Sequence, residues 1–264
     1  MTHPAYEQLR QVTPLAGVVL ATNPSPMTLE GTNTWLLRAP GGEQSIVVDP
    51  GPDDEAHLRA VLAVAGEVTT ILLTHGHFDH SDGARRLHEV TGAPVRALDP
   101  AHQLGDEGLS DGDVIAAGGI ELRVWATPGH SSDSLSFLLD PRDGSAAAIL
   151  TGDTILGRGT TVVAYPDGDL GHYLDSLRRL LELGDATVLT GHGPELPRVG
   201  EAAAAYLAHR EERLNQVRGA LELLGSDVSP RAIVEHVYAD IDKVLWPAAE
   251  VSVQAQLAYL RTAG

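Results

Sequence analysis

Residues 72–80, LLTHGHFDH, place three histidines and one aspartate within six positions behind an apolar run. His75, His77 and His80 are spaced i, i+2 and i+5, and Asp79 precedes the last of them. In an extended backbone, residues i and i+2 face the same side, so the imidazoles of His75 and His77 can bind one metal ion together. If a helix begins near Asp79, the chain turns there, and Asp79 and His80 can point at a second ion close by.

Similar chemistry recurs at the ends of other apolar runs. ILLTH ends at His75, VWATPGH at His130, AILTGD at Asp153 and TVLTGH at His192. If each run is a strand, a sheet brings these four ends along one edge, where α/β folds bind their ligands. A fifth run, SIVVDPG, carries Asp49 at its tip.

These residue types predict a centre that activates water. His130 would complete a three-histidine site with one open position, and His192 would join Asp79 and His80 at a second site. Asp153 has two carboxylate oxygens and can bridge both ions, and two metals about 3.5–4 Å apart can hold a hydroxide for hydrolysis. We therefore expect Asp79 and Asp153 to be the catalytic carboxylates. Nitrogen and oxygen ligands suit zinc and would also accept iron or manganese.

The composition excludes several alternatives. Cysteine is absent from the 264 residues, which excludes disulfides, thiolate nucleophiles and cysteine-ligated zinc. The net charge of −18 disfavours broad attraction to duplex DNA or anionic membranes. No apolar stretch approaches the roughly 20 residues of a membrane span, and the N-terminus has no signal-peptide core. We expect a cytoplasmic protein.

The pattern of apolar residues predicts an α/β chain with a helical tail, divided into a domain of residues 1–200 and one of residues 201–264. Strands are expected at 17–22, 32–38, 44–50, 68–74, 134–140, 146–153 and 186–190, with a hairpin at Gly118 and Gly119 and a turn at 141–144. Helices are expected at 53–66, 81–91, 199–224, 229–239 and 247–262. The remaining histidines, among them His57, His88, His102 and His236, are interpreted as surface or packing residues.

At this point the motifs resemble a known family. THGHFDH resembles the His-x-His-x-Asp-His signature of the metallo-β-lactamase superfamily, and PGHSSDS, TGDT and TGHG resemble its remaining metal motifs in the right order. The resemblance spans residues 17–193 and implies a four-layer αβ/βα sandwich with metals at the sheet edge. It further implies two zinc ions per chain: the first bound by His75, His77 and His130, the second by Asp79, His80 and His192, with Asp153 bridging and Asp49 orienting ligands.

A narrower resemblance concerns residues 23–37, residues 206–217 and the tail. These are similar to the lactamase-beta-like endoribonuclease branch, whose tail is a winged-helix-like domain. Here the sequence ends just after the third expected helix, so we expect the β-wing to be short or missing. Acidic side chains outnumber basic ones beyond residue 200, so we expect the tail to pack over the active-site edge or to form a homodimer rather than to read DNA.

For the substrate, we place single-stranded RNA slightly ahead of a small thioester or ester. The resemblance indicates single-stranded RNA, for which Arg158 and Arg210 are the candidate substrate-binding residues, whereas the acidity indicates a small ester, thioester or lactam. A thioesterase resembling glyoxalase II would share all seven ligands. True β-lactamases of the superfamily lack the bridging aspartate, so Asp153 argues against β-lactams as the main substrate. A mononuclear-iron oxygenase would leave the second site empty, and a metal-stabilised binding module would have one closed site.

Overall fold

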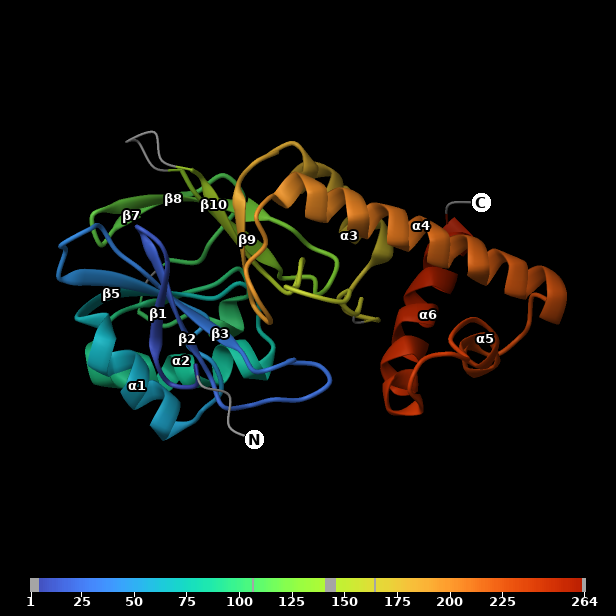
Figure 1. The fold of residues 1–264 in the computed structure, drawn as a ribbon, viewed down its shortest axis with the longest axis horizontal. Coiled ribbons are helices and arrows are strands. Elements are labelled where there is room, and N and C mark those ends of the chain that lie inside the picture. The colour runs from blue at the N-terminus through green and yellow to red at the C-terminus, as the bar shows by residue number, and fades with distance from the viewer. Residues whose placement is uncertain (1–4, 106, 141–145, 164, 263–264) are drawn as a thin grey trace.

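The computed structural model describes residues 5–105, 107–140, 146–163 and 165–262. Two sheets pack face to face (Figure 1). The first has the order β1-β2-β3-β4-β5-β6 and the second the order β11-β10-β9-β8-β7. The strands of the first sheet are β1 (Leu9–Thr13), β2 (Ala16–Leu20), β3 (Asn33–Leu37), β4 (Gln44–Val48), β5 (Glu67–Leu72) and β6 (Val95–Arg96). Those of the second are β7 (Val114–Ala117), β8 (Ile120–Ala126), β9 (Leu135–Leu139), β10 (Ala148–Gly152) and β11 (Thr187–Thr190).

The central core lies between the two sheets. Trp35 and Ile46 of the first sheet face Leu122, Phe137 and Leu150 of the second, and all five are buried. Every residue of β2, β3 and β10 is buried because helices cover the opposite faces of the sheets. This double burial explains why these strands are near-continuous apolar runs in the sequence rather than alternating ones.

Helices complete the outer layers. On the first sheet, α1 (Glu55–Ala65) and α2 (Phe78–Thr91) bury their apolar faces against the strands. On the second, α3 (Leu170–Leu181) and the first half of α4 (Val199–Leu224) do the same. The expected four-layer α/β sandwich is confirmed.

The tail is helical. After α4 come α5 (Pro230–Val237) and α6 (Trp246–Thr262), which form a small core of their own with the second half of α4. Ser229 caps α5 through its hydroxyl, and Pro230 stands at the first helical position, where its missing N–H costs nothing. Between residues 199 and 262, all of which are described, there is no strand, so no β-wing forms in that range.

The tail also packs on the sandwich. Figure 1 shows α6 turning back beneath α4 toward the body of the molecule. Ala255 and Tyr259 of α6 contact the core that α3 and α4 build over the second sheet. Because α4 contributes to both cores, it joins the two parts as one continuous helix, and the boundary at residue 200 stays a prediction.

Some elements differ from expectation. Strands β1 and β6 are not predicted, because no residue of β1 is buried and β6 has only two residues. Helix α2 begins at Phe78, three residues earlier than predicted, since the polar metal motif is itself its first turn. The turn at 141–144 lies outside the described residues. Among the described helices, none combines the length and apolarity that crossing a bilayer requires.

Candidate metal centre

The expected ligands meet at one edge of the sandwich. Asp153 directly follows β10, His192 lies two residues after β11, and His130 lies in the loop after β8. The remaining ligands lie between the end of β5 and the first turn of α2. Three clusters of donors, each with ligand atoms within 4.8 Å of one another, contain all seven residues. We call His75, His77 and His130 the first group, and Asp79, His80 and His192 the second group. The remaining cluster, His75, His80 and Asp153, joins the two groups.

The first group presents three imidazole nitrogens to one point. His77 Nδ1 lies 3.0 Å from both His75 Nε2 and His130 Nε2. One nitrogen carries one proton or one lone pair, so it cannot form good hydrogen bonds with both neighbours. A cation between the three lone pairs satisfies them all.

The second group combines two imidazoles with carboxylates. His192 Nε2 lies 3.2 Å from His80 Nε2 and 3.1 Å from Asp79 Oδ2. Asp153 lies between the two groups: its Oδ1 is 3.4 Å from His192 Nε2, and its Oδ2 is 3.7 Å from His130 Nε2. This Oδ1 is buried and makes no hydrogen bond, although buried polar atoms are nearly always paired.

Hydrogen bonds behind the imidazoles fix which nitrogen faces the centre. His130 Nδ1 donates to the Val162 carbonyl at 2.6 Å, and His192 Nδ1 donates to the Gly31 carbonyl at 3.1 Å. His80 Nδ1 donates to Asp49 Oδ2 at 2.9 Å. Since each Nδ1 carries the proton, each Nε2 keeps a lone pair directed into the centre, an arrangement common to metal-binding histidines.

Besides its bond to His80, Asp49 also holds Thr74, just beyond the end of β5. Its Oδ1 accepts from the Thr74 backbone N–H at 2.8 Å, and its Oδ2 accepts from the Thr74 hydroxyl at 2.7 Å. The Thr74 hydroxyl in turn accepts from His75 Nδ1 at 3.0 Å. Asp49 therefore holds His80 directly and His75 through Thr74; that it orients metal ligands stays a prediction.

Glycine permits the close approach of two strand tips. A Cβ atom at Gly191 would lie 2.7 Å from Asp153 Oδ1 and 2.8 Å from His80 Cε1. Real Cβ atoms do not approach other atoms this closely, so only glycine fits between the two ligands.

The centre is strongly polarised. Burial alone would lower the pKa of His80, but the charges of Asp153 and Asp49 raise it well above its usual value. Burial likewise opposes charge on His192, yet Asp153 and Asp79 raise its pKa to about 9. Burial would raise the pKa of Asp153, but the charges of His192 and His80 hold it well below its usual range. The carboxylates thus stay ionised and attract positive charge to the second group.

Several observations agree that this donor set fits divalent cations: lone pairs that converge, a buried carboxylate oxygen without a hydrogen bond, and acceptors that fix each tautomer. A family model described as the metallo-beta-lactamase superfamily matches residues 27–192, a range that includes every donor. The chain belongs to this superfamily. A second family model, described as the beta-lactamase associated winged helix domain, matches residues 229–264 of the chain.

Other members of the superfamily are similar over most of the chain. A Beta-lactamase-like protein 2 homolog of Caenorhabditis elegans is 31% identical to this chain, and the alignment covers 91% of this chain and 81% of that protein. An Atrochrysone carboxyl ACP thioesterase of Aspergillus fumigatus is 34% identical over 77% of this chain and 64% of its own. A Beta-lactamase domain protein from Burkholderia ambifaria has a similar structure, with a TM-score of 0.81 and 25% identity, covering 100% of this chain and 90% of its own.

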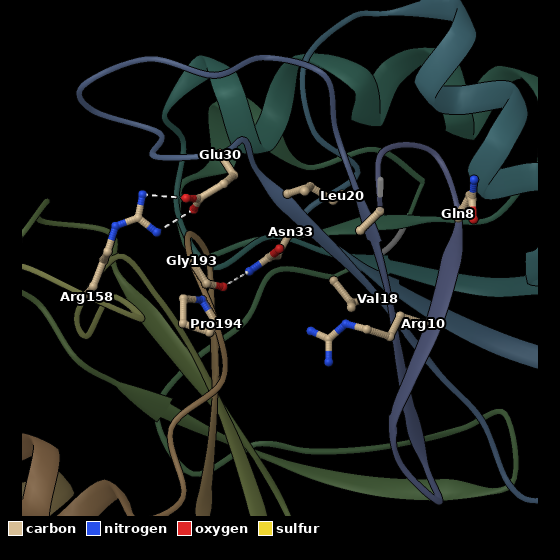
Figure 2. Close-up of a pocket in the computed structure, with 10 residues that line it drawn as sticks. Gln8, Arg10, Val18, Leu20, Glu30, Asn33, Arg158, Gly193 and Pro194 are labelled. Carbon is tan, nitrogen blue, oxygen red and sulfur yellow. Dashed lines mark hydrogen bonds and ion pairs between the residues drawn. The ribbon is translucent and has the colours of Figure 1, made fainter. Parts of the chain in front are cut away.

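The two arginines predicted to bind substrate lie in different surroundings. Arg158 is half-exposed and forms an ion pair with Glu30, 2.6 Å away, at the rim of a pocket that Figure 2 shows beside Asn33 and Gly193. Arg210 is buried, donates to the Thr161 carbonyl and lies over the Tyr173 ring. Both also line a second cleft, which reaches His130 and Asp153.

The sequence did not predict several groups that hold the residues of the metal centre in place. The Val162 and Gly31 carbonyls carry no residue-type signal, so nothing in the sequence could mark them. His57, interpreted as a surface or packing residue, is fully buried: its Nδ1 lies 2.7 Å from Glu7 Oε2 and its Nε2 lies 2.9 Å from the Thr34 hydroxyl. That hydroxyl donates to the Asp49 carbonyl, so His57 braces the strand tip from behind.

Proposed function

We propose that this chain is a metal-dependent hydrolase that holds two divalent cations, zinc foremost, and cleaves the thioester or ester bond of a small carboxylic acid. One observation carries the proposal: Asp153 lies between two groups of three donors, with Oδ2 near His130 and Oδ1 near His192, and its buried Oδ1 has no hydrogen bond. Bound there, the cations would supply water that ionises near neutral pH and would offset charge that develops on the substrate oxygen.

The residues of the chain supply positioning and proton transfer. Asp79 Oδ2 faces the centre beside His192, and its pKa is lowered because the His192 hydrogen bond and the His80 charge outweigh burial. As an ionised carboxylate it takes the proton of the attacking water. The water oxygen bonds to the carbonyl carbon, the carbon–sulfur bond breaks, and the proton passes from Asp79 to the departing sulfur. The products are a carboxylate, a thiol and one proton.

Two observations favour a small acyl substrate over single-stranded RNA. Arg158 is paired with Glu30. Arg210 is buried and lines a cleft beside His130 and Asp153 rather than the outer surface, so neither guanidinium is displayed on the surface for a long polyanion. Among the similar proteins is one described as an ACP thioesterase. The alternative is phosphodiester cleavage in RNA. This is the activity of the branch that residues 23–37 and 206–217 resemble, and the assays described below test it as well.

The test begins with elemental analysis of protein purified without added metal. We expect two divalent ions per chain, mainly zinc; one iron per chain would favour the oxygenase. The protein is then assayed on acyl-N-acetylcysteamine thioesters, a short single-stranded RNA and a chromogenic cephalosporin, with chelator-treated protein as the control. Rapid thioester turnover that the chelator abolishes supports the proposal. RNA cleavage at low salt without thioester turnover would overturn the substrate class and leave the metal centre intact.

A further inference from the structure

A cleft of about 370 Å³ runs from the metal centre to the helical tail. His130 and Asp153 line it at one end, and Ile241, Leu245 and Ala248 of the tail line it at the other. Its volume falls in the range of small-molecule sites, about 300–1,000 Å³. We call this space the interdomain cleft. Because two metal ligands form part of its wall, a molecule in the cleft lies against the reacting centre.

The walls of the interdomain cleft are mainly aliphatic. Met27, Leu29 and Leu156 line the side of the sandwich opposite the tail residues. Met27 is 49% exposed although it is a large apolar side chain. Apolar surface left open beside a reactive centre is typical of a binding site for an apolar group.

Three arginines line the cleft in a chain that is acidic overall; Arg158 is paired with Glu30, and Arg210 and Arg213 leave the cleft positively charged. Arg210 is only 4% exposed, and its Nε makes no hydrogen bond. Arg213 lies over the Tyr238 ring, 4.6 Å from its centroid. Among the described residues neither guanidinium forms an ion pair, and Asp153 is the only acidic side chain that lines the cleft. Arg210 donates to the Thr161 carbonyl and Arg213 donates to Gln216 Oε1, but these partners are neutral. A ligand that brings an anion would supply the countercharge and form charge-assisted hydrogen bonds, which are stronger than neutral ones.

We propose that the interdomain cleft binds the acyl portion of the substrate, and that this acyl group is apolar and ends in a carboxylate held by Arg210 and Arg213. The inference rests on the proposed thioester hydrolysis and names the substrate class. The cleft suits RNA less well, because nucleobases are held by stacking on aromatic rings. Among the described residues that line the cleft, Tyr238 is the only phenylalanine, tyrosine or tryptophan, and the guanidinium of Arg213 already lies over its ring.

Three N-acetylcysteamine thioesters test the acyl group: acetyl, octanoyl and the half-thioester of suberic acid, which adds a terminal carboxylate. We expect kcat/KM of the metal-loaded protein to rise at least about tenfold from acetyl to octanoyl, because methylene groups are buried. The carboxylate should raise it about tenfold again through a charged hydrogen bond. Equal values for all three thioesters would overturn the inference while leaving thioester hydrolysis intact.

Two matched pairs of variants locate the site. Ala248→Trp fills the cleft, and Ala204→Trp places the same side chain at an exposed position of α4 outside it. Arg213→Gln removes a cleft cation, and Arg218→Gln removes an exposed one from the same helix. We expect Ala248→Trp to lower the suberyl-to-acetyl ratio about tenfold and Arg213→Gln to lower the suberyl-to-octanoyl ratio similarly. Neither ratio should change in the matched controls.

A binding measurement separates this inference from the proposed function. Calorimetric titration of chelator-treated protein with suberate needs no catalysis, and we expect Ala248→Trp to weaken binding at least tenfold relative to Ala204→Trp. The protein could bind suberate, lose that binding in Ala248→Trp and still hydrolyse no thioester. This outcome would refute the proposed function and support the assignment of the cleft as a binding site. Absence of suberate binding, or equal binding in both tryptophan variants, would overturn the cleft assignment.

Discussion

Asp49→Asn is the substitution whose consequences the structure defines best, because it keeps the shape of the side chain and changes one atom that accepts two hydrogen bonds. Asparagine can still accept from the Thr74 N–H through its oxygen. Its amide nitrogen, in place of Oδ2, cannot accept from His80 Nδ1 or from the Thr74 hydroxyl. Each lost bond to a charged group contributes about 1.5–3 kcal/mol. Released from Asp49, His80 can place its proton on Nε2, which removes the lone pair from the second donor group.

We therefore expect Asp49→Asn to weaken the second metal site by about 10–100-fold, the usual effect of losing a partner behind a ligating histidine. The first site should change less, since His75 keeps its bond to Thr74 and His130 keeps its bond to Val162. Competition with a chromophoric chelator, read as two successive releases of metal, measures both affinities. Asp175→Asn, on the exposed surface of α3, is the control for loss of one negative charge. If both sites of Asp49→Asn kept their affinity, the tautomer argument would be wrong.

Three further results are expected. Asp153→Ala should weaken both metal sites and abolish activity, because its two oxygens face different donor groups; two tightly bound metals with full activity would refute the bridging role. Gly191→Ala should lower metal content and reduce kcat at least about tenfold with little loss of helical circular dichroism, because a Cβ atom there meets Asp153 and His80. Burial would raise the pKa of Glu7, but His57 and Thr22 lower it, so the ionised form stabilises the fold above the unfolded pKa and this contribution disappears as pH falls through the folded pKa. Chemical denaturation of wild type and Glu7→Gln should then differ by about 1 kcal/mol or less at pH 7 and converge once the pH falls below the lowered pKa of Glu7, whereas a difference that does not change as the pH falls would contradict the assignment.

Much of the architecture could be predicted because its signals lie in residue types. The strands β2, β3, β4 and β5 are short apolar runs that end at turn residues, and α4 was placed at its observed bounds of 199–224. The seven candidate donors could be predicted to lie close together because imidazole and carboxylate side chains follow four separate strand tips. These features could be predicted from the sequence because each of them is encoded in a short segment of the chain.

The remaining features depend on contacts between distant segments. The acceptors behind His130 and His192 are backbone carbonyls, which any residue type supplies. The sequence marks Arg210 only as a candidate substrate-binding residue, because its burial and its bond to the Thr161 carbonyl follow from how α4 packs over the second sheet. The interdomain cleft likewise has walls from residues far apart in the chain, and no single stretch of sequence predicts it.

Helix α4 connects the tail to the chemistry of the centre. Arg210 of α4 donates to the Thr161 carbonyl, and the next carbonyl along the chain, that of Val162, accepts from His130 Nδ1. A shift of α4 would therefore move the acceptor that fixes the tautomer of a first-group histidine. The same turns of α4 supply Arg210 and Arg213 to the interdomain cleft. Because one rigid helix holds both the cleft wall and the loop behind His130, the position of a substrate and the geometry of its reacting centre are set together.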